Sequence, residues 1–156
     1  MLFAGADAEA GVIIGADEDI VIQAAVAGAQ RVVCIDSSAP ALEALTNSAR
    51  MNAVEPRVET LRGDAFELLR ALRTDRERFD VVVLDPPAFI KRRKDARKGE
   101  QAYQRINTLA MELVADGGVL VSASCSHHLS RDALRGVLLR ASRDLRRDLQ
   151  LLEEGG

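Results

Sequence analysis

The chain has 156 residues, the length of one domain, and its 47% hydrophobic and 29% charged residues are typical of a globular protein rather than a disordered or fibrous one. No run of about 18 apolar residues predicts a membrane span, and residues 1–11 lack the basic start and apolar stretch of a secretory signal. Cys34 and Cys125 are too few for a disulfide framework, so we expect a reducing, cytoplasmic location and no membrane partner.

Charge is unevenly distributed along the chain, although the net charge is only −3. Residues 1–30 contain five acidic residues and no basic one, whereas residues 91–98 (KRRKDARK) contain six basic residues and one acidic one. A basic run on a nearly neutral domain favours a polyanionic partner. From the run alone, a solvated surface loop is the simpler explanation.

The first predicted elements are a strand over residues 11–14 and a helix over residues 20–27. The turn between them, residues 15–19 (GADED), has one glycine and three acidic residues. It contains neither the GxGxxG pattern of dinucleotide-binding domains nor a P-loop, which disfavours a nicotinamide-dependent dehydrogenase. We interpret this turn as an acidic surface segment that caps a helix, and not as a cofactor cradle.

From residue 31 onward, strands alternate with helices. Short β-branched runs predict strands over residues 31–36, 58–62, 79–84 and 119–124, the last preceded by a turn at Gly117-Gly118. Apolar residues at helical spacing predict helices over residues 38–51, 65–73, 100–114 and, after a Ser130 cap, 131–147. Residues 149–152 are predicted to open a further strand. This alternation predicts an α/β fold, a doubly wound, mostly parallel sheet with helices on both faces.

Four polar residues come at or just after the ends of predicted strands: Asp36, Asp64, Asp85 and Cys125. The carboxyl ends of parallel strands share one rim of the sheet, where ligands bind in such folds, so we expect these residues to line one site. Simpler roles exist for three of them. Asp36 could begin a helix, Asp64 follows a glycine in a common turn pair, and a cysteine at a strand end can be inert.

The other cysteine and the histidines indicate no further site. Cys34 lies inside a predicted buried strand and is interpreted as a small core residue. His127 and His128 stand beside Cys125, but no fourth ligand occurs at the spacing that a zinc site needs. We therefore expect no bound metal.

Four segments and their spacings resemble a known family: RVVCIDSS (31–38), RGDAFELL (62–69), FDVVVLDPPAFIK (79–91) and YQRINTLAMELVADGGVLVSASCS (103–126). Residues 24–154 resemble the methyltransferase domain of bacterial S-adenosylmethionine-dependent ribosomal RNA methyltransferases that form 5-methylcytosine in large-subunit RNA. The resemblance implies a Rossmann-like class I methyltransferase fold, S-adenosylmethionine as cofactor, and a ribosomal RNA partner with a single-stranded or loop target. It predicts one domain over residues 1–156, with a divergent segment 1–30 and a family-like core 31–154.

The resemblance also implies which residues bind the cofactor. Asp36 would accept hydrogen bonds from the ribose hydroxyls, a task that suits an acceptor-only carboxylate. Ser37 would border the adenine. Asp64, with the backbone of Ala65, would contact the adenine amine.

For the reaction, the resemblance implies that Asp85 and Pro86 line the floor where the cofactor's methyl group meets the target base, and that Cys125 is the nucleophile. Cytosine C5 is a poor nucleophile, and a thiolate that adds at C6 makes C5 able to take the methyl group. Asp85 would act as the acid at N3. The target base must leave its stack, and the neighbouring phosphates would be bound by Lys91, Arg92, Arg93 and Lys94.

The chain departs from the family in its first turn. An ungapped alignment back from Gln23 places Val12 at the family's first-strand acid, and Glu18 and Asp19 at its paired turn glycines. Two carboxylates there would repel the cofactor's own carboxylate and keep the backbone away from it, so we expect impaired cofactor binding. This departure, an end before the family's closing antiparallel strands and no preceding RNA-binding domain are typical of an altered or truncated copy.

Two alternatives to a cytosine C5 methyltransferase stay open from the sequence: a non-catalytic remnant with impaired cofactor binding, and an exocyclic-amine methyltransferase. The latter class uses an Asp/Asn-Pro-Pro motif followed at once by an aromatic residue, whereas Ala88 here precedes Phe89, and its chemistry has no use for Cys125. The sequence does not indicate an oligomeric state.

Overall fold

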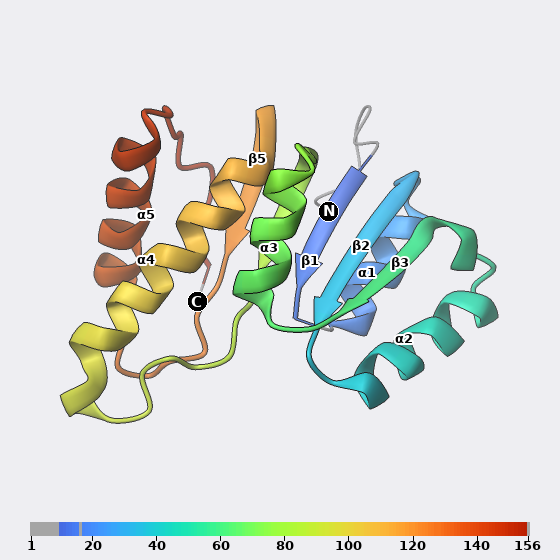
Figure 1. Ribbon diagram of the computed structural model, residues 1–156, viewed down its shortest axis with the longest axis horizontal. Coiled ribbons are helices and arrows are strands. Elements are labelled where there is room, and N and C mark those ends of the chain that lie inside the picture. The colour runs from blue at the N-terminus through green and yellow to red at the C-terminus, as the bar shows by residue number, and fades with distance from the viewer. Residues whose placement is uncertain (1–9, 16, 156) are drawn as a thin grey trace.

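Five strands form one parallel sheet in the computed structural model, which describes residues 10–15 and 17–155 (Figure 1). The strands are β1 (Ala10–Ile14), β2 (Arg31–Asp36), β3 (Val58–Arg62), β4 (Phe79–Leu84) and β5 (Val114–Ser122). Their spatial order is β3-β2-β1-β4-β5, and every pairing is parallel. The predicted bounds of β2, β3 and β4 are confirmed. The acidic residues Asp7 and Glu9, and Ala16 of the first turn, lie outside the described residues.

Helices cover both faces of the sheet, which confirms the predicted fold class. They are α1 (Glu18–Val26), α2 (Ala39–Met51), α3 (Ala65–Thr74), α4 (Ala96–Leu113) and α5 (Arg131–Leu145), with short 3-10 turns η1 (Glu55–Arg57) and η2 (Arg93–Asp95). Figure 1 shows α3 in front of the sheet and α1 behind it. Within the described ranges, no helix has the length and apolar character needed to cross a membrane.

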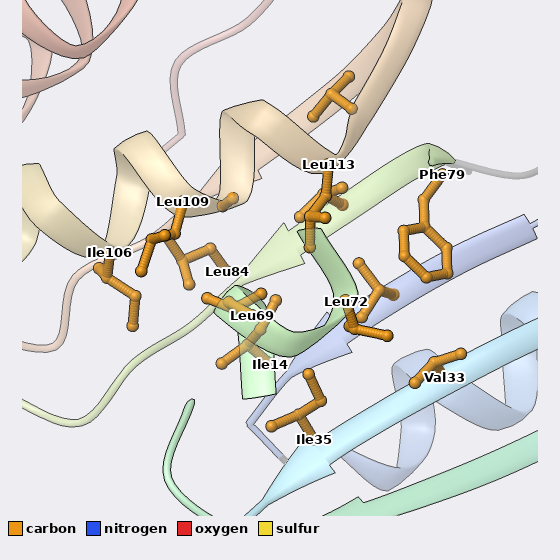
Figure 2. Close-up of a cluster of buried hydrophobic side chains, with 14 residues drawn as sticks. Ile14, Val33, Ile35, Leu69, Leu72, Phe79, Leu84, Ile106, Leu109 and Leu113 are labelled. Atoms are coloured by element: carbon orange, nitrogen blue, oxygen red, sulfur yellow. The ribbon is translucent and has the colours of Figure 1, made fainter. Parts of the chain in front are cut away.

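The core divides into two layers because successive side chains of a strand point to opposite faces. One layer packs strand residues against α3 and α4, as Figure 2 shows for Ile14, Ile35, Leu69, Leu84 and Ile106. The other layer packs the alternate strand positions against α1 and α2, and it includes Cys34. Cys34 is fully buried, which confirms its interpretation as a core residue, and burial raises the pKa of its thiol to about 12.

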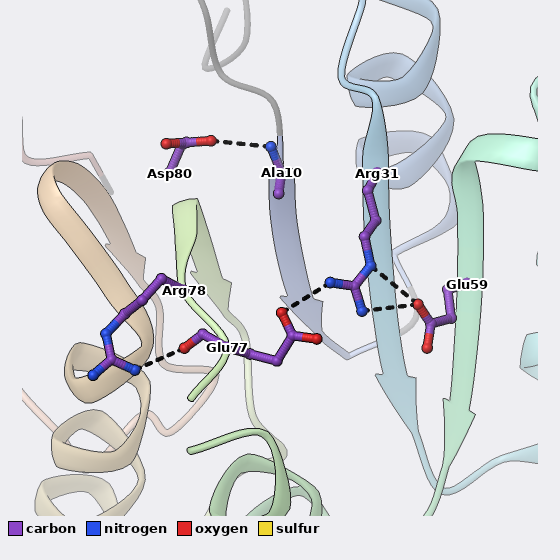
Figure 3. Close-up of polar contacts among 6 residues, drawn as sticks. All are labelled: Ala10, Arg31, Glu59, Glu77, Arg78 and Asp80. Atoms are coloured by element: carbon purple, nitrogen blue, oxygen red, sulfur yellow. Dashed lines mark hydrogen bonds and ion pairs between the residues drawn. The ribbon is translucent and has the colours of Figure 1, made fainter. Parts of the chain in front are cut away.

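Ion pairs and hydrogen bonds join the elements at the amino ends of the strands (Figure 3). The Arg31 guanidinium on β2 contacts Glu59 on β3 and Glu77 just before β4, both at 3.0 Å. The Asp80 carboxylate accepts a hydrogen bond from the Ala10 N–H at 3.0 Å. These contacts lie at the end of the sheet opposite to the rim predicted to bind ligands, so their role is structural.

Several predicted element bounds differ from the structure by one or two residues, including the ends of β5 at Ser122 and of α5 at Leu145, and three predictions are wrong by more. α4 begins at Ala96 rather than at residue 100, because η2 leads directly into it. β5 begins at Val114, and Gly117-Gly118 form an irregularity within this strand, where a Cβ on Gly118 would lie 2.8 Å from the Asp80 carbonyl oxygen. Residues 149–152 form no strand, and Leu151 and Leu152 are exposed.

The first turn lies directly against the end of β4. Gly15 follows β1 with a positive φ of 98°, and its N–H donates to the Ile35 carbonyl at 2.9 Å. The Asp85 N–H donates to the Ile14 carbonyl at 3.1 Å. A Cβ on Gly15 would lie 2.7 Å from the Asp85 carbonyl oxygen, so the turn and Asp85 can approach this closely only with glycine.

We therefore expect Gly15→Ala to lower the free energy of unfolding by about 2 kcal/mol or more, through backbone strain plus the clash with Asp85. Gly28→Ala is the matched control: Gly28 also has a positive φ (116°), but a Cβ there meets nothing within 4 Å. It should cost only the strain, about 1 kcal/mol. Urea denaturation measures both, and equal losses would contradict a specific contact between the turn and Asp85.

Candidate active site

The order of the strands reverses direction between β1 and β4. From β1 the chain proceeds outward to β2 and β3, and from β4 it proceeds the other way to β5. The loops after β1 and β4 therefore diverge and leave a crevice, which is where open α/β sheets bind ligands. A hollow of about 530 Å³ lies there, and its lining residues are Gly15, Asp17, Glu18, Asp19 and Asp85.

The acidic turn has two roles in this structure. The Asp17 carboxylate accepts a hydrogen bond from the Ile20 N–H at 3.2 Å, which confirms the interpretation as a helix cap. The same turn also lines the hollow, so its interpretation as a surface segment alone is incomplete. The Glu18 carboxylate accepts a hydrogen bond from the Ser48 hydroxyl on α2, and Asp19 is exposed. The lining is thus rich in carboxylates.

Asp85 and Cys125 come together at this rim although 40 residues separate them in the chain. Asp85 follows β4 directly, and Cys125 lies three residues after β5. The Cys125 thiol donates to Asp85 Oδ1 at 3.6 Å between sulfur and oxygen. The negative charge of Asp85, with smaller contributions from burial and this hydrogen bond, raises the pKa of the Cys125 thiol. Cys125 is exposed, so reagents and ligands can reach it.

Asp36 and Asp64 lie at the same rim, after β2 and β3. Asp36 Oδ1 accepts from the Ser38 N–H at 2.7 Å, and Asp64 Oδ1 caps α3 by accepting from the Glu67 N–H at 3.0 Å. The Gly63 N–H donates to the Asp36 carbonyl at 3.1 Å, which joins the two turns. Neither aspartate belongs to the lining of the hollow.

The remaining sequence-derived candidates occupy the neighbouring loops. Ser37 is exposed beside Asp36, and Ala65 is the first residue of α3. Pro86 is buried. The four basic residues of the next loop are all exposed, as binding to phosphates requires: Lys91, Arg92, Arg93 and Lys94. In the part of the chain that the structure describes, no three His, Cys, Asp or Glu side chains form a group that could hold a metal ion.

Sequence reasoning missed a set of polar residues beneath Cys125. Tyr103 and Asn107 are fully buried on α4, one helical turn apart. Tyr103 contacts Ser124 and Ser126, and Asn107 accepts a hydrogen bond from Ser122. The available signal was the pattern of alternate serines, at positions 122, 124 and 126, together with two polar residues four positions apart on one face of a helix.

Residues 19–121 match the protein family described as Conserved hypothetical protein 95. This range is more than half of the chain and includes β2, β3 and β4 in full. The chain belongs to the Conserved hypothetical protein 95 family. The match begins inside α1 and includes Asp36, Asp64 and Asp85, but it ends at residue 121, before Cys125.

This member of the Conserved hypothetical protein 95 family is similar to a curated methyltransferase. It is 36% identical over 134 residues to the Ribosomal RNA large subunit methyltransferase I of Citrobacter koseri, a match that covers 85% of this chain and 34% of that protein. The chain thus spans about one third of the length of the curated relatives it matches.

Two solved structures share the fold. A SAM-dependent methyltransferase from Agrobacterium tumefaciens has a TM-score of 0.73 at 17% identity, over 88% of this chain and 45% of that one. An O-methyltransferase from Bacillus cereus, solved in complex with SAH, has a TM-score of 0.63 at 18% identity, over 88% and 62%. At such identities the likeness establishes the Rossmann-like methyltransferase fold.

The contact between Asp85 and Cys125 predicts how the thiol responds to pH. Replacing Asp85 by Asn removes the negative charge that opposes ionisation, so the pKa of Cys125 should fall. The pH dependence of alkylation by iodoacetamide measures this midpoint, because Cys34 is buried and only Cys125 is accessible among the two thiols. Cys125→Ser is the blank. A midpoint that stays unchanged in Asp85→Asn would contradict the contact.

Proposed function

We propose that this chain is the catalytic domain of an S-adenosylmethionine-dependent RNA methyltransferase that methylates cytosine C5 in ribosomal RNA, with Cys125 as the nucleophile. The observation that supports it best is the pairing of Cys125 with Asp85 at the carboxyl rim of the sheet, 3.6 Å apart. The name of the Citrobacter koseri relative supports ribosomal RNA of the large subunit as the substrate class. An exposed thiol at this rim has no role in transfer to an exocyclic amine.

The rim offers groups that fit S-adenosylmethionine. Asp36 at the end of β2 is an acceptor suited to ribose hydroxyls, with Ser37 beside it, and Asp64 with the start of α3 at Ala65 would bind the adenine amine. Asp85, above buried Pro86, would face the reacting centre. When bound, the cofactor supplies a methyl group on a cationic sulfur, and the carboxylates of the hollow suit positive charge.

The geometry of the pair supports a route for the protons. Cys125 already donates its proton toward Asp85, so the carboxylate can take this proton as the sulfur forms its bond to C6 of the base. Protonated Asp85 is then the acid that serves N3, where negative charge develops. After the methyl group has bonded to C5, the C5 proton is lost to water, the thiolate departs, and N3 returns its proton to Asp85, which restores the aromatic ring and the starting state of the pair.

The basic loop follows Asp85 in the chain. Lys91 through Lys94 follow the end of β4 by a few residues and are exposed, so they would bind the phosphates on either side of the extruded base. Arg97 and Lys98 belong to the first turn of α4. We therefore assign phosphate binding mainly to residues 91–94, with a smaller contribution from Arg97 and Lys98.

The decisive experiment uses a transcript of large-subunit ribosomal RNA that has tritium at cytosine C5. Methylation at C5 displaces this hydrogen into water, whereas methylation of an exocyclic amine leaves it in place. We expect tritium release that requires S-adenosylmethionine and that falls at least about a hundredfold in Cys125→Ser. Cys34→Ala is the control, because it removes the other thiol from the core and should retain release. Methyl incorporation without release would favour the exocyclic-amine alternative.

RNA binding by the basic loop has its own test. Replacing Lys91, Arg92, Arg93 and Lys94 by Ala should weaken binding and reduce the slope of log affinity against log salt by up to about 3, because each single-strand phosphate contact contributes about 0.7. The matched control removes four exposed arginines from α5 instead: Arg131, Arg135, Arg140 and Arg143. If both quadruple variants reduce the slope equally, binding depends on overall charge rather than on this loop.

One observation favours a second candidate, a non-catalytic domain with impaired cofactor binding. Asp17, Glu18 and Asp19 line the hollow, where they would repel the carboxylate of the cofactor. The double change Glu18→Gly and Asp19→Gly should then raise the affinity for S-adenosylmethionine roughly fivefold, the equivalent of about 1 kcal/mol, in a calorimetric titration.

A charge-only variant separates the two causes of this impairment. Glu18→Gln with Asp19→Asn removes the repulsion and keeps the bulk of both side chains. If this variant by itself raises the affinity for S-adenosylmethionine, charge is the cause. Asp36→Ala in the glycine background should reverse much of the gain if the ribose lies there. Low-micromolar binding by the unchanged chain would exclude the second candidate.

A further inference from the structure

Tyr103 connects α4 to the segment that contains Cys125. Its side chain is fully buried, and its hydroxyl accepts a hydrogen bond from Ser124 Oγ at 3.0 Å and lies 2.7 Å from Ser126 Oγ. These two serines flank Cys125 in the chain, so a single hydroxyl restrains the backbone on both sides of the thiol. The Ser126 N–H also donates to Ser124 Oγ at 3.1 Å, which folds the segment into a turn around Cys125.

The same tyrosine restrains the loop that follows Asp85. The Ile90 N–H donates to Ser126 Oγ at 3.3 Å, and this is the oxygen that Tyr103 contacts. The ring of Phe89 packs edge-on against the ring of Tyr103, with 4.8 Å between their centroids. The loop after β4 and the loop after β5 therefore meet at one buried side chain.

Two neighbours of Tyr103 on α4 complete this attachment. Gly99, one turn earlier, has no side chain, and a Cβ there would lie 2.1 Å from Ile90 Cγ1, so Ile90 packs directly against the helix. Asn107, one turn later, donates to the Tyr103 carbonyl at 2.8 Å and accepts from Ser122 at 2.7 Å. Ser122 is the last residue of β5. One face of α4 thus contacts both segments that define the site.

We infer that Tyr103 is a positioning residue, which holds the Cys125 thiol within reach of the Asp85 carboxylate by joining both loops to α4. Its catalytic meaning rests on the proposed function, whereas the geometry can be tested without cofactor or RNA. A hydroxyl suits this role because it donates one hydrogen bond and accepts two. Phenylalanine at this position would keep the packed ring and leave Ser124 and Ser126 without their shared partner, which costs more at a buried site than at the surface.

The test compares the alkylation midpoint of Cys125 in four forms: the unchanged chain, Tyr103→Phe, Asp85→Asn and the double variant. If Tyr103 holds the pair together, Tyr103→Phe should move the midpoint to lower pH, because the thiol then escapes the charge of Asp85. The shift should have the same direction as in Asp85→Asn. In the double variant the two shifts should not add, since both act through one contact. A fully additive double variant would overturn the inference.

Several controls keep the outcome clear. Thr108→Val removes another hydroxyl from α4, one that donates to the Gln104 carbonyl at 2.8 Å, and should leave the midpoint unchanged. Ser126→Ala removes the oxygen between Tyr103 and Ile90 and should reproduce the Tyr103→Phe shift, which provides a second variant if the first does not fold. His127 and His128, the other titratable groups in this segment, are present in every form.

A folded Tyr103→Phe variant with an unchanged midpoint would show that the tyrosine is merely structural and would overturn the inference. Circular dichroism and thermal melting establish that each variant is folded. Alkylation needs neither S-adenosylmethionine nor RNA. If the unchanged chain releases no tritium while Tyr103→Phe shifts the alkylation midpoint, the proposed function is contradicted and the role of Tyr103 stands. If Tyr103→Phe releases tritium at the full rate and its midpoint is unchanged, the role of Tyr103 is contradicted and the proposed function stands.

Discussion

The central strand β1 pairs with β2 on one side and with β4 on the other, and the position of the candidate site depends on this double pairing. Ile14, at the end of β1, is in register with Ile35 on β2 and with Leu84 on β4. The next residue of each strand segment is therefore at the same level of the sheet. These residues are Gly15, Asp36 and Asp85. The parallel ladder thus brings a turn and two carboxylates, distant in sequence, to one rim.

Much of the fold could be predicted because local sequence and tertiary environment agree in most elements. The runs at 31–36 and 79–84 are β-branched and buried on both faces, so their strand character needs no partner to be recognised. The errors arise where a contact with a residue distant in sequence decides where a strand or helix begins. Gly118 belongs to β5 because its backbone packs against the Asp80 carbonyl, and α4 continues through Gly99 because Ile90 covers it. Neither contact is visible in local propensity.

The site was predictable in part for the same reason. Alternation of strands and helices predicts a parallel sheet, which places Asp85 and Cys125 at one rim without any distance being known. The acidic turn was harder to interpret, since it lacks the glycine pattern by which such turns are recognised, although the strand order sets it beside Asp85. No role could be predicted for Tyr103, because the hydrogen bonds of its hydroxyl depend on how α4 packs against the loops after β4 and β5.

Asp85 belongs to two environments at once: it lines the hollow beside the first turn, and it accepts the hydrogen bond of Cys125. A single carboxylate therefore links whatever occupies the hollow to the protonation of the thiol. A cation held beside Asp85 would offset its charge and favour the thiolate. By thermodynamic reciprocity, ionising the thiol would tighten the binding of that cation to the same degree. The Cys125 thiol is thus most ionised when a cation occupies the hollow beside Asp85, which limits reaction of the thiol with stray electrophiles while the hollow is empty.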